Sequence, residues 1–315
     1  MEKLRYIDLR ENPKALLAHT GLNPDEFDAL AVFFDQAWQR YISAYTLEGK
    51  PRKRQNRGRN NETFATPEDQ LLFVLIYLKT NPLQETLAAA FGLRQPHANP
   101  WLKLLLPLLE QALGRADCLP ERESEHLARA VAHKQRVLID GTERPIQRSL
   151  DYEVQKEHYS GKKKRHAVKN VVVADPEKRI LYLSQTYEGK VHDKRIVDEE
   201  ALEFGHQEAE DSELDKTLEL LQDTGFQGYK PLGVVVVQPM KKPRGKELTD
   251  EQKASNRAIS SQRVVVEHAI GGVKIWRVVK EIFRSWCAKL RDRVMVLACG
   301  LHNFRLMCRA SPIQN

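Results

Sequence analysis

Three acidic residues that lie far apart in the chain are the strongest candidates for chemistry. Asp140 and Asp223 each end an apolar, strand-like run, and Glu267 lies in a later stretch with helical spacing. Mg²⁺ prefers oxygen ligands and usually takes only a few carboxylates, which leaves room for water and substrate phosphates. Two acids at strand ends and a third on a late helix therefore predict a site for hard divalent cations.

Composition points to an anionic partner. The chain has 315 residues, a formal net charge of +7 and 41% apolar residues, and its sequence pI is about 9.1. This length suggests about two domains, and the basic balance fits a nucleic-acid backbone as substrate.

No signal peptide or membrane-spanning stretch is recognisable, so we expect a cytoplasmic, nucleoid-associated bacterial protein without membrane contact. Four cysteines without CxxC spacing favour reduced thiols: Cys118, Cys287, Cys299 and Cys308.

The first third of the chain predicts helices. Asn23 followed by Pro24 is typical of a helix start, and apolar residues recur at helical spacing to about Ser43. A basic linker over residues 50–59 follows. It is interpreted either as an arm that enters a minor groove through Arg52, Lys53 and Arg54, or as a flexible solubilising linker.

Three further helices predict a helix-turn-helix over residues 66–113. Thr66 caps the first, residues 83–91 form a short second helix that ends at Gly92, and residues 97–113 form the third. The prolines before residue 101 suggest that the third helix starts late. This helix would enter the major groove, with Arg94, His97 and Lys103 at the DNA. An ordinary helical hairpin is the alternative.

Strand-like runs begin after residue 135. They lie at 136–140, 168–174, 180–185, 218–222 and 233–238, with helices expected over 192–206, from about 249 through Glu267, and over 291–308. This order predicts a mixed α/β sheet of the ribonuclease-H-like type, in which the first and fourth long strands are neighbours. We therefore expect an all-α domain over residues 1–118 and a ribonuclease-H-like catalytic domain over 119–315, with Asp140 close to Asp223.

Spacing on the late helix suggests a functional face. Arg263, Glu267 and Lys274 are four and then seven residues apart, so they share one side of a helix. Glu267 would complete the metal site while the two basic residues hold phosphates. A solvated face with one salt bridge is the alternative.

Five segments resemble the DDE transposases of insertion-sequence family five, the bacterial relatives of the Harbinger transposases. They are Ile139-Asp-Gly-Thr-Glu-Arg-Pro145, His158-Tyr-Ser-Gly-Lys-Lys-Lys164, Gly189-Lys-Val-His-Asp193, Gln222-Asp-Thr-Gly-Phe-Gln-Gly228 and the helix that carries Glu267. The resemblance covers most of the chain. One departure is Ser260, which stands where the family has a tyrosine.

The resemblance implies a metal-dependent DNA transposase. It would bind the terminal inverted repeats of its element, cut the ends and transfer the freed 3′-hydroxyls to target DNA, acting on double-stranded DNA as a homodimer. Two Mg²⁺ or Mn²⁺ ions would be held by Asp140, Asp223 and Glu267. Asp193 is the rival second carboxylate, 74 rather than 44 residues before Glu267; a helix cap is its other interpretation.

A dense basic run lies in the second motif. Residues 162–165 are Lys162, Lys163, Lys164 and Arg165, which would clamp DNA phosphates or form a solvated turn. Glu143 and Arg144 would pair near the active site, or simply with each other at the surface. Two other functions stay open: a non-catalytic DNA-binding regulator descended from a transposase, and a nuclease of the same fold that performs no strand transfer.

Overall fold

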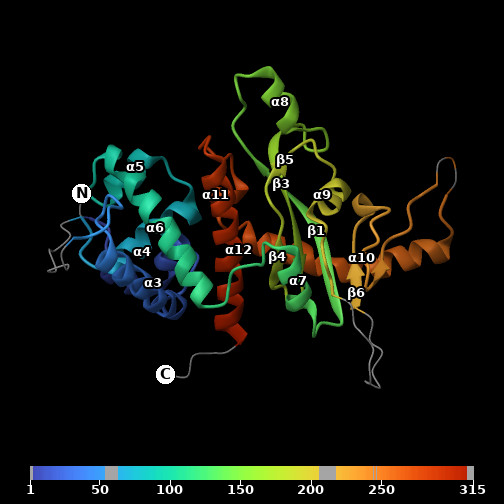
Figure 1. Cartoon of the computed structure of the whole chain (residues 1–315), viewed down its shortest axis with the longest axis horizontal. Helices are drawn as coiled ribbons and strands as arrows, with labels where there is room; N and C mark the ends of the chain where they lie inside the picture. Colours follow the sequence, from blue (N-terminus) through green and yellow to red (C-terminus); the bar gives the residue numbers. More distant parts are fainter. Residues whose placement is uncertain (1–2, 54–62, 206–217, 244, 246, 311–315) are drawn as a thin grey trace. The chain divides into compact units, whose positions relative to one another are not determined.

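The chain folds into two compact units. The computed structural model describes residues 3–53, 63–205, 218–243, 245 and 247–310 (Figure 1). The helical unit comprises residues 1–119, 274–281 and 287–315, and the sheet unit comprises 120–273 and 282–286. The first segment of the helical unit thus ends beside the boundary predicted at 118, but later segments return to this unit. The assignment of separate functions to residues 1–118 and 119–315 stays a prediction.

The helical unit draws its helices from both ends of the chain. They are α1 (Tyr6–Arg10), α2 (Pro13–Thr20), α3 (Pro24–Ala44), α4 (Pro67–Thr80), α5 (Gln84–Ala90), α6 (Gln95–Arg115), α11 (Arg277–Lys280) and α12 (Ala288–Ala310). The predicted start of α3 is confirmed, because Asn23 and Glu26 bond reciprocally in a capping box. Thr66 caps α4 as predicted, accepting a bond from the Asp69 N–H at 3.2 Å.

Helix α4 is the centre of this unit. Every residue from Leu71 to Leu78 is buried, which explains why this run is apolar on all sides rather than striped. The helices α3, α5, α6 and α11 all contact α4. Phe64, Phe73 and Trp101 form part of an aromatic cluster around it. The packing therefore fixes α4 to α6 as one block.

Helix α6 starts earlier than the prolines suggested. It begins at Gln95 rather than His97, with Pro96 in its first turn and Pro100 inside the helix. A proline in the first turn costs no hydrogen bond, because the N–H that proline lacks would have no intrahelical partner at this position. Pro100 removes one bond, but Trp101 and Leu102 are buried immediately after it, and this packing holds the helix together. Gly92, at φ +65°, makes the turn that precedes α6.

The sheet unit is mixed α/β. Its elements are α7 (Ser124–Val131), β1 (Arg136–Pro145), α8 (Tyr152–His158), β2 (Tyr159–Ser160), β3 (Arg165–Ala174), β4 (Ile180–Leu183), β5 (Tyr187–Glu188), α9 (Asp193–Glu200), β6 (Leu218–Leu221), the 3₁₀ turn η1 (Thr224–Phe226), β7 (Val234–Val237) and α10 (Asp250–Val273). The strand order is β2-β3-β1-β6-β7, and β4 and β5 also pair with β3. β1 is antiparallel to β3 and parallel to β6. The predicted mixed sheet with neighbouring first and fourth long strands is confirmed.

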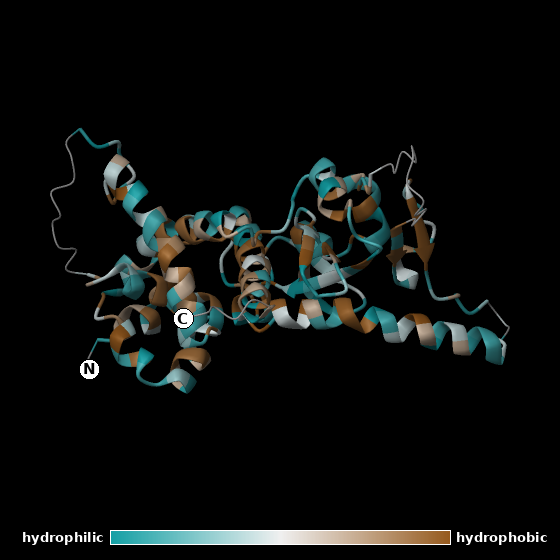
Figure 2. Cartoon of the chain, turned by 90° about the horizontal axis from the view of Figure 1, so that it is seen from below, coloured by the Kyte–Doolittle hydropathy of each residue, from teal (hydrophilic) through white to brown (hydrophobic). Residues whose placement is uncertain are grey.

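The two faces of β1 have different coverings. Val137 and Ile139 belong to a core that also contains residues of α7 and α9. Because side chains alternate along a strand, Leu138 and Asp140 lie on the other face. Helix α10 packs against β1 and β3, and it carries Arg263, whose guanidinium faces Asp140. In Figure 2 hydrophilic colours predominate over the first turns of α10, whose residues there are mostly exposed.

Three predicted boundaries of the sheet unit are wrong. β1 continues to Pro145, so Asp140 lies inside the strand rather than at its end. α9 ends at Glu200 instead of 206, because Ala201 adopts a left-handed conformation at φ +47°; residues 206–217 lie outside the described ones. α10 ends at Val273, so Lys274 lies just beyond the helix on which it was expected.

Gly189 offers a test of this packing. A Cβ on Gly189 would lie 2.5 Å from the His158 carbonyl oxygen and 2.6 Å from that of Ala167. Both are backbone atoms, so Gly189→Ala should lower the free energy of unfolding by about 1–3 kcal/mol. Thermal unfolding followed by circular dichroism measures this. Gly161→Ala is the control, since a Cβ there meets nothing within 4 Å; equal melting temperatures for the two variants would contradict the description.

Candidate active site

Asp140 and Asp223 meet at one edge of the sheet. The parallel pairing of β1 and β6 ends at Leu138 and Leu221, and each aspartate follows two residues later. The carboxyl ends of neighbouring parallel strands lie together, so the two acids are carried to the same place. Their side chains are 21% and 38% exposed. The predicted proximity of these two carboxylates is thus found.

Backbone N–H groups hold both carboxylates. The Gly141 N–H donates to Asp140 Oδ1 at 2.8 Å. The Thr224 N–H donates to Asp223 Oδ1 at 2.6 Å, because Asp223 caps η1. In addition, the Gln238 side-chain amide donates to the Asp223 carbonyl oxygen. Each aspartate therefore has one oxygen fixed by the backbone that follows it.

A single guanidinium faces both acids. Arg263 Nη2 lies 3.9 Å from Asp140 Oδ1, and Arg263 Nη1 lies 3.5 Å from Asp223 Oδ1. The Arg263 side chain is 9% exposed, and its buried Nε has no hydrogen-bond partner. Two carboxylates thus converge on the position of one cation, at distances longer than direct hydrogen bonds.

The environment favours the neutral form of Asp140. The pKa of this carboxyl is raised from 3.8 to about 6, because burial and the nearby charges of Asp223 and Asp193 together outweigh the opposing effects of Arg263 and the Gly141 N–H. Arg263 alone therefore does not balance the negative charge gathered here. A set of hard oxygen donors with uncompensated charge fits a divalent cation.

Glu267 is less closely tied to this pair. It is exposed and lies one helical turn after Arg263 on α10. Within the described part of the chain, no three acidic, histidine or cysteine side chains are grouped closely enough to hold a metal ion. The structure thus brings two of the three predicted acids together, and the role of Glu267 stays a prediction. Lys274 belongs to the helical unit, and its role is likewise still a prediction.

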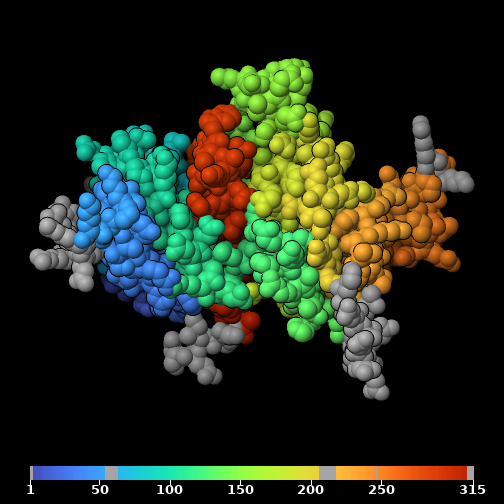
Figure 3. Space-filling view, viewed as in Figure 1, coloured from blue at the N-terminus to red at the C-terminus, as the bar shows by residue number. Residues whose placement is uncertain are grey.

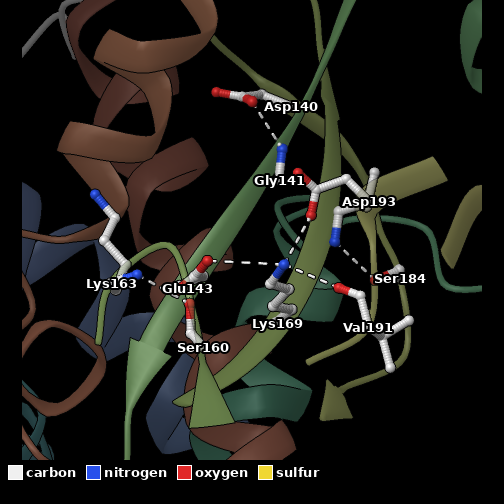
Figure 4. Close-up of polar contacts among 10 residues, drawn as sticks. Asp140, Gly141, Glu143, Ser160, Lys163, Lys169, Ser184, Val191 and Asp193 are labelled. Carbon is white, nitrogen blue, oxygen red and sulfur yellow. Dashed lines mark hydrogen bonds and ion pairs between the residues drawn. The ribbon is translucent and has the colours of Figure 1, made fainter. Parts of the chain in front are cut away.

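Asp193 lies beside the pair. Its Oδ1 is 3.3 Å from Lys169 Nζ, and Lys169 Nζ is 3.7 Å from Glu143 Oε1 (Figure 4).

The expected pairing of Glu143 with Arg144 is wrong, because neighbouring residues on a strand point to opposite faces. Arg144 instead donates to the Asn170 side chain at 2.8 Å. The signal for the Glu143–Lys169 pair is the strand register, in which the two residues are direct partners.

The predicted phosphate-binding run lies in an exposed turn. Lys162, Lys163, Lys164 and Arg165 are all exposed, between β2 and the start of β3. Ion pairs among the described residues involve none of these four. In Figure 3 the neighbouring helix α8 forms the knob at the top of the picture. Four unpaired cations on one turn are available to an anionic backbone.

The candidate DNA contacts of the helical unit also lie at the surface. Arg94 precedes α6, and His97 and Lys103 lie in its first turns; all three are exposed. Lys53 is exposed, and Arg52 is partly buried with its Nε donating to the Tyr45 carbonyl oxygen at 2.8 Å. Arg54 lies outside the described residues. The first turns of α6 thus bury Ala98 and Trp101 and leave His97 and Lys103 on an exposed face, as a groove-reading helix requires.

Comparison with known families identifies the two parts of the chain. The family described as DDE superfamily endonuclease matches residues 139–303. This chain belongs to the DDE superfamily of endonucleases. The family described as the helix-turn-helix of DDE superfamily endonuclease matches residues 66–115, which span α4 to α6. The predicted helix-turn-helix of this DDE endonuclease is therefore confirmed.

A curated relative of this DDE endonuclease agrees. The chain is 28% identical over 244 residues to a probable transposase for insertion sequence element IS702 from Microchaete diplosiphon. The matched region covers 77% of this chain and 82% of the relative. No solved structure matches the chain significantly. No helix in the described ranges is both long and apolar enough to span a lipid bilayer.

Proposed function

We propose that this DDE endonuclease is a DNA transposase that cuts the ends of its own element and joins the freed 3′-hydroxyls to target DNA. The observation that carries the proposal is the meeting of Asp140 and Asp223 at one sheet edge, two residues beyond the last β1–β6 pair. The helix-turn-helix would bind the terminal inverted repeats. The exposed run from Lys162 to Arg165 would hold the DNA backbone near β3.

Asp140, Asp223 and Glu267 would hold divalent metal ions, which we take to be two Mg²⁺ or Mn²⁺ ions. The chemistry that such ions supply when bound is activation of the attacking water or hydroxyl and stabilisation of charge on the phosphate. The fit rests on the oxygen donors and on the charge that Arg263 leaves uncompensated. The guanidinium of Arg263 faces the same two carboxylates.

Burial of Arg263 gives it a second task. Its guanidinium is planar, always charged and shaped for bidentate contact with phosphate. With divalent ions held by the carboxylates, this guanidinium would bind a phosphate of the scissile strand. Glu267, one turn further along α10, is exposed on the same helix and would be the third carboxylate to hold the ions. A homodimer would bring two element ends together.

The experiment uses DNA that flanks the coding region. Purified protein is incubated with labelled duplexes carrying these ends, with supercoiled target DNA and with Mg²⁺ or chelator. Cut ends together with joined products support a transposase. Cut ends without joined products indicate a nuclease, and specific binding without cutting indicates a regulator. Cleavage in excess chelator would contradict the metal-dependent mechanism.

The basic turn has its own prediction. The double variant Lys162→Gln, Lys163→Gln should weaken DNA binding. The plot of the logarithm of the association constant against the logarithm of the salt concentration should become less steep by up to about 1.8, or about 0.9 for each lost phosphate contact. Lys164 is left unchanged because its backbone is left-handed, at φ +52°. Fluorescence anisotropy at several salt concentrations measures the slope.

The control removes the same charge elsewhere. Lys242 and Lys253 already pair with Glu247 and Asp250. Lys242→Gln with Lys253→Gln should therefore leave the salt slope nearly unchanged. Equal slopes for both double variants would show that the basic turn does not contact DNA phosphates.

A further inference from the structure

Two glycines beside the candidate catalytic aspartates have a common neighbour. A Cβ on Gly141 would lie 2.9 Å from Asp193 Cγ and 3.0 Å from its Oδ1. A Cβ on Gly225 would lie 3.4 Å from Asp193 Oδ2. Gly141 directly follows Asp140, and Gly225 comes two residues after Asp223. The carboxylate of Asp193 is thus packed against both segments that carry the acids.

Space, rather than backbone conformation, requires glycine at position 141, whereas a Cβ on Gly225 would only touch Asp193. Neither Gly141 nor Gly225 has the positive φ that would itself favour glycine. At Gly141 a methyl group would press on a side chain that is itself held in place. The close approach of Asp193 therefore explains the glycine in the Asp140-Gly141 pair.

A buried lysine holds Asp193 in position. Lys169 Nζ donates to the Val191 carbonyl oxygen at 2.9 Å and lies 3.3 Å from Asp193 Oδ1. Lys169 is 12% exposed, and Glu143, the other acid beside it, is 9% exposed. Figure 4 shows Lys169 between Glu143 and Asp193, with Gly141 next to Asp193. The lysine balances charge that would otherwise add to that of Asp140.

The geometry points to Asp193 as a positioning residue that sets the spacing between Asp140 and Asp223, with Lys169 as its fixed counter-ion. This inference rests on the proposed function, because it assumes that these two aspartates bind the metal ions. Asp193 acts through the backbone of Gly141 and Gly225. It begins α9, so the first turn of that helix and the sheet edge are held together.

This role differs from the two interpretations that the sequence offered. A helix cap would bond the N–H groups of α9, but the capping position is held by His192, which makes no side-chain cap bond. A second metal ligand would need a free oxygen aimed at the ion. The Asp193 carboxylate instead faces Lys169 through Oδ1 and packs against Gly141 and Gly225. Residues that orient metal ligands typically change metal affinity or activity by about 10–100-fold when replaced.

The first test measures metal binding without DNA. Mn²⁺ binding to the full-length protein is followed by electron paramagnetic resonance for the wild type, Asp193→Ala, Asp193→Asn and Asp140→Asn. We expect Asp193→Ala to weaken binding by about 10–100-fold, Asp193→Asn, which keeps the shape, to weaken it less, and Asp140→Asn to abolish it. Wild-type affinity in Asp193→Ala would overturn the inference. Complete loss of binding would also overturn it, since Asp193 would then be a ligand.

The second test uses coupling between Gly141 and Asp193. Gly141→Ala should lower the melting temperature in chelator, and adding Asp193→Ala should recover part of that loss, because the methyl group gains the vacated space. Additive effects would overturn the packing argument. Circular dichroism of Asp193→Asn checks that the fold persists. These measurements need no catalysis, so they still decide the inference if the wild type cuts no DNA, an outcome that would refute only the proposed function.

Discussion

Asp140→Asn should abolish strand cleavage, with a loss of roughly 10³-fold or more, while DNA affinity stays within about twofold. The asparagine keeps the size of the side chain and an oxygen for the Gly141 N–H bond. It loses the negative charge that a divalent ion requires, and a neutral amide is a much weaker ligand for Mg²⁺. Single-turnover cleavage of labelled element ends measures the loss, and anisotropy measures the affinity.

Related variants sharpen this prediction. Asp223→Asn and Glu267→Gln should cause losses of the same order, and Glu267→Gln is the more informative because Glu267 is exposed and outside the observed pair. Glu251→Gln changes an exposed acid in the first turn of the same helix and serves as the control. Full cleavage by any one of the three site variants would exclude that residue from the metal site.

The second large effect is a gain in stability from the same Asp140→Asn change. Burial raises the pKa of Asp140 to about 6, despite the opposing charge of Arg263. Ionised Asp140 thus opposes folding at neutral pH, on the order of 2–3 kcal/mol for this shift. The amide avoids that cost, so the variant should unfold at a higher temperature than the wild type at pH 8 in chelator. Function and stability are expected to conflict at this residue.

The pH dependence follows from the direction of the shift. Between pH 3.8 and about 6 the folded protein keeps a proton on Asp140 that the unfolded chain releases. The stability of the wild type is therefore complete below this window and falls as pH rises through 6. The advantage of Asp140→Asn should be largest at pH 8 and vanish near pH 4. Calorimetric unfolding at several pH values measures it.

Added metal ions provide the control for this experiment. A ligand that binds only the folded state stabilises it, so Mg²⁺ should raise the melting temperature of the wild type and not that of Asp140→Asn. A variant less stable than the wild type at pH 8 in chelator would show that Arg263 and the Gly141 N–H outweigh burial.

The sequence was sufficient for features that depend on local pattern. Apolar runs located the strands, and parallel neighbours then required Asp140 and Asp223 to meet. The Asn23 and Thr66 caps marked helix starts because capping is a short-range interaction. Helix α6 could not be placed from its prolines, since burial of Trp101 and Leu102 outweighs the bond that Pro100 removes.

Features that depend on register were beyond the sequence. Glu143 and Lys169 are 26 positions apart, and only the antiparallel pairing of β1 with β3 makes them partners. The same holds for Asp193, whose contact with Gly141 requires α9 to start beside β1. Spacing alone suggested a cap or a ligand for this residue. Arg263 was assigned to phosphate from its helical spacing, and its burial between two aspartates emerged only from the fold.

The helical unit takes its helices from both ends of the chain, and this has a consequence for synthesis on the ribosome. Trp276, which belongs to the segment 274–281, is fully buried. Its ring lies within 3 Å of the position that a Cβ on Gly21 would occupy. The nascent N-terminal part therefore lacks part of its interior until residues 274–281 have emerged. A chain interrupted during translation would present an incompletely folded helix-turn-helix unit, so we expect that only finished molecules compete for the element ends.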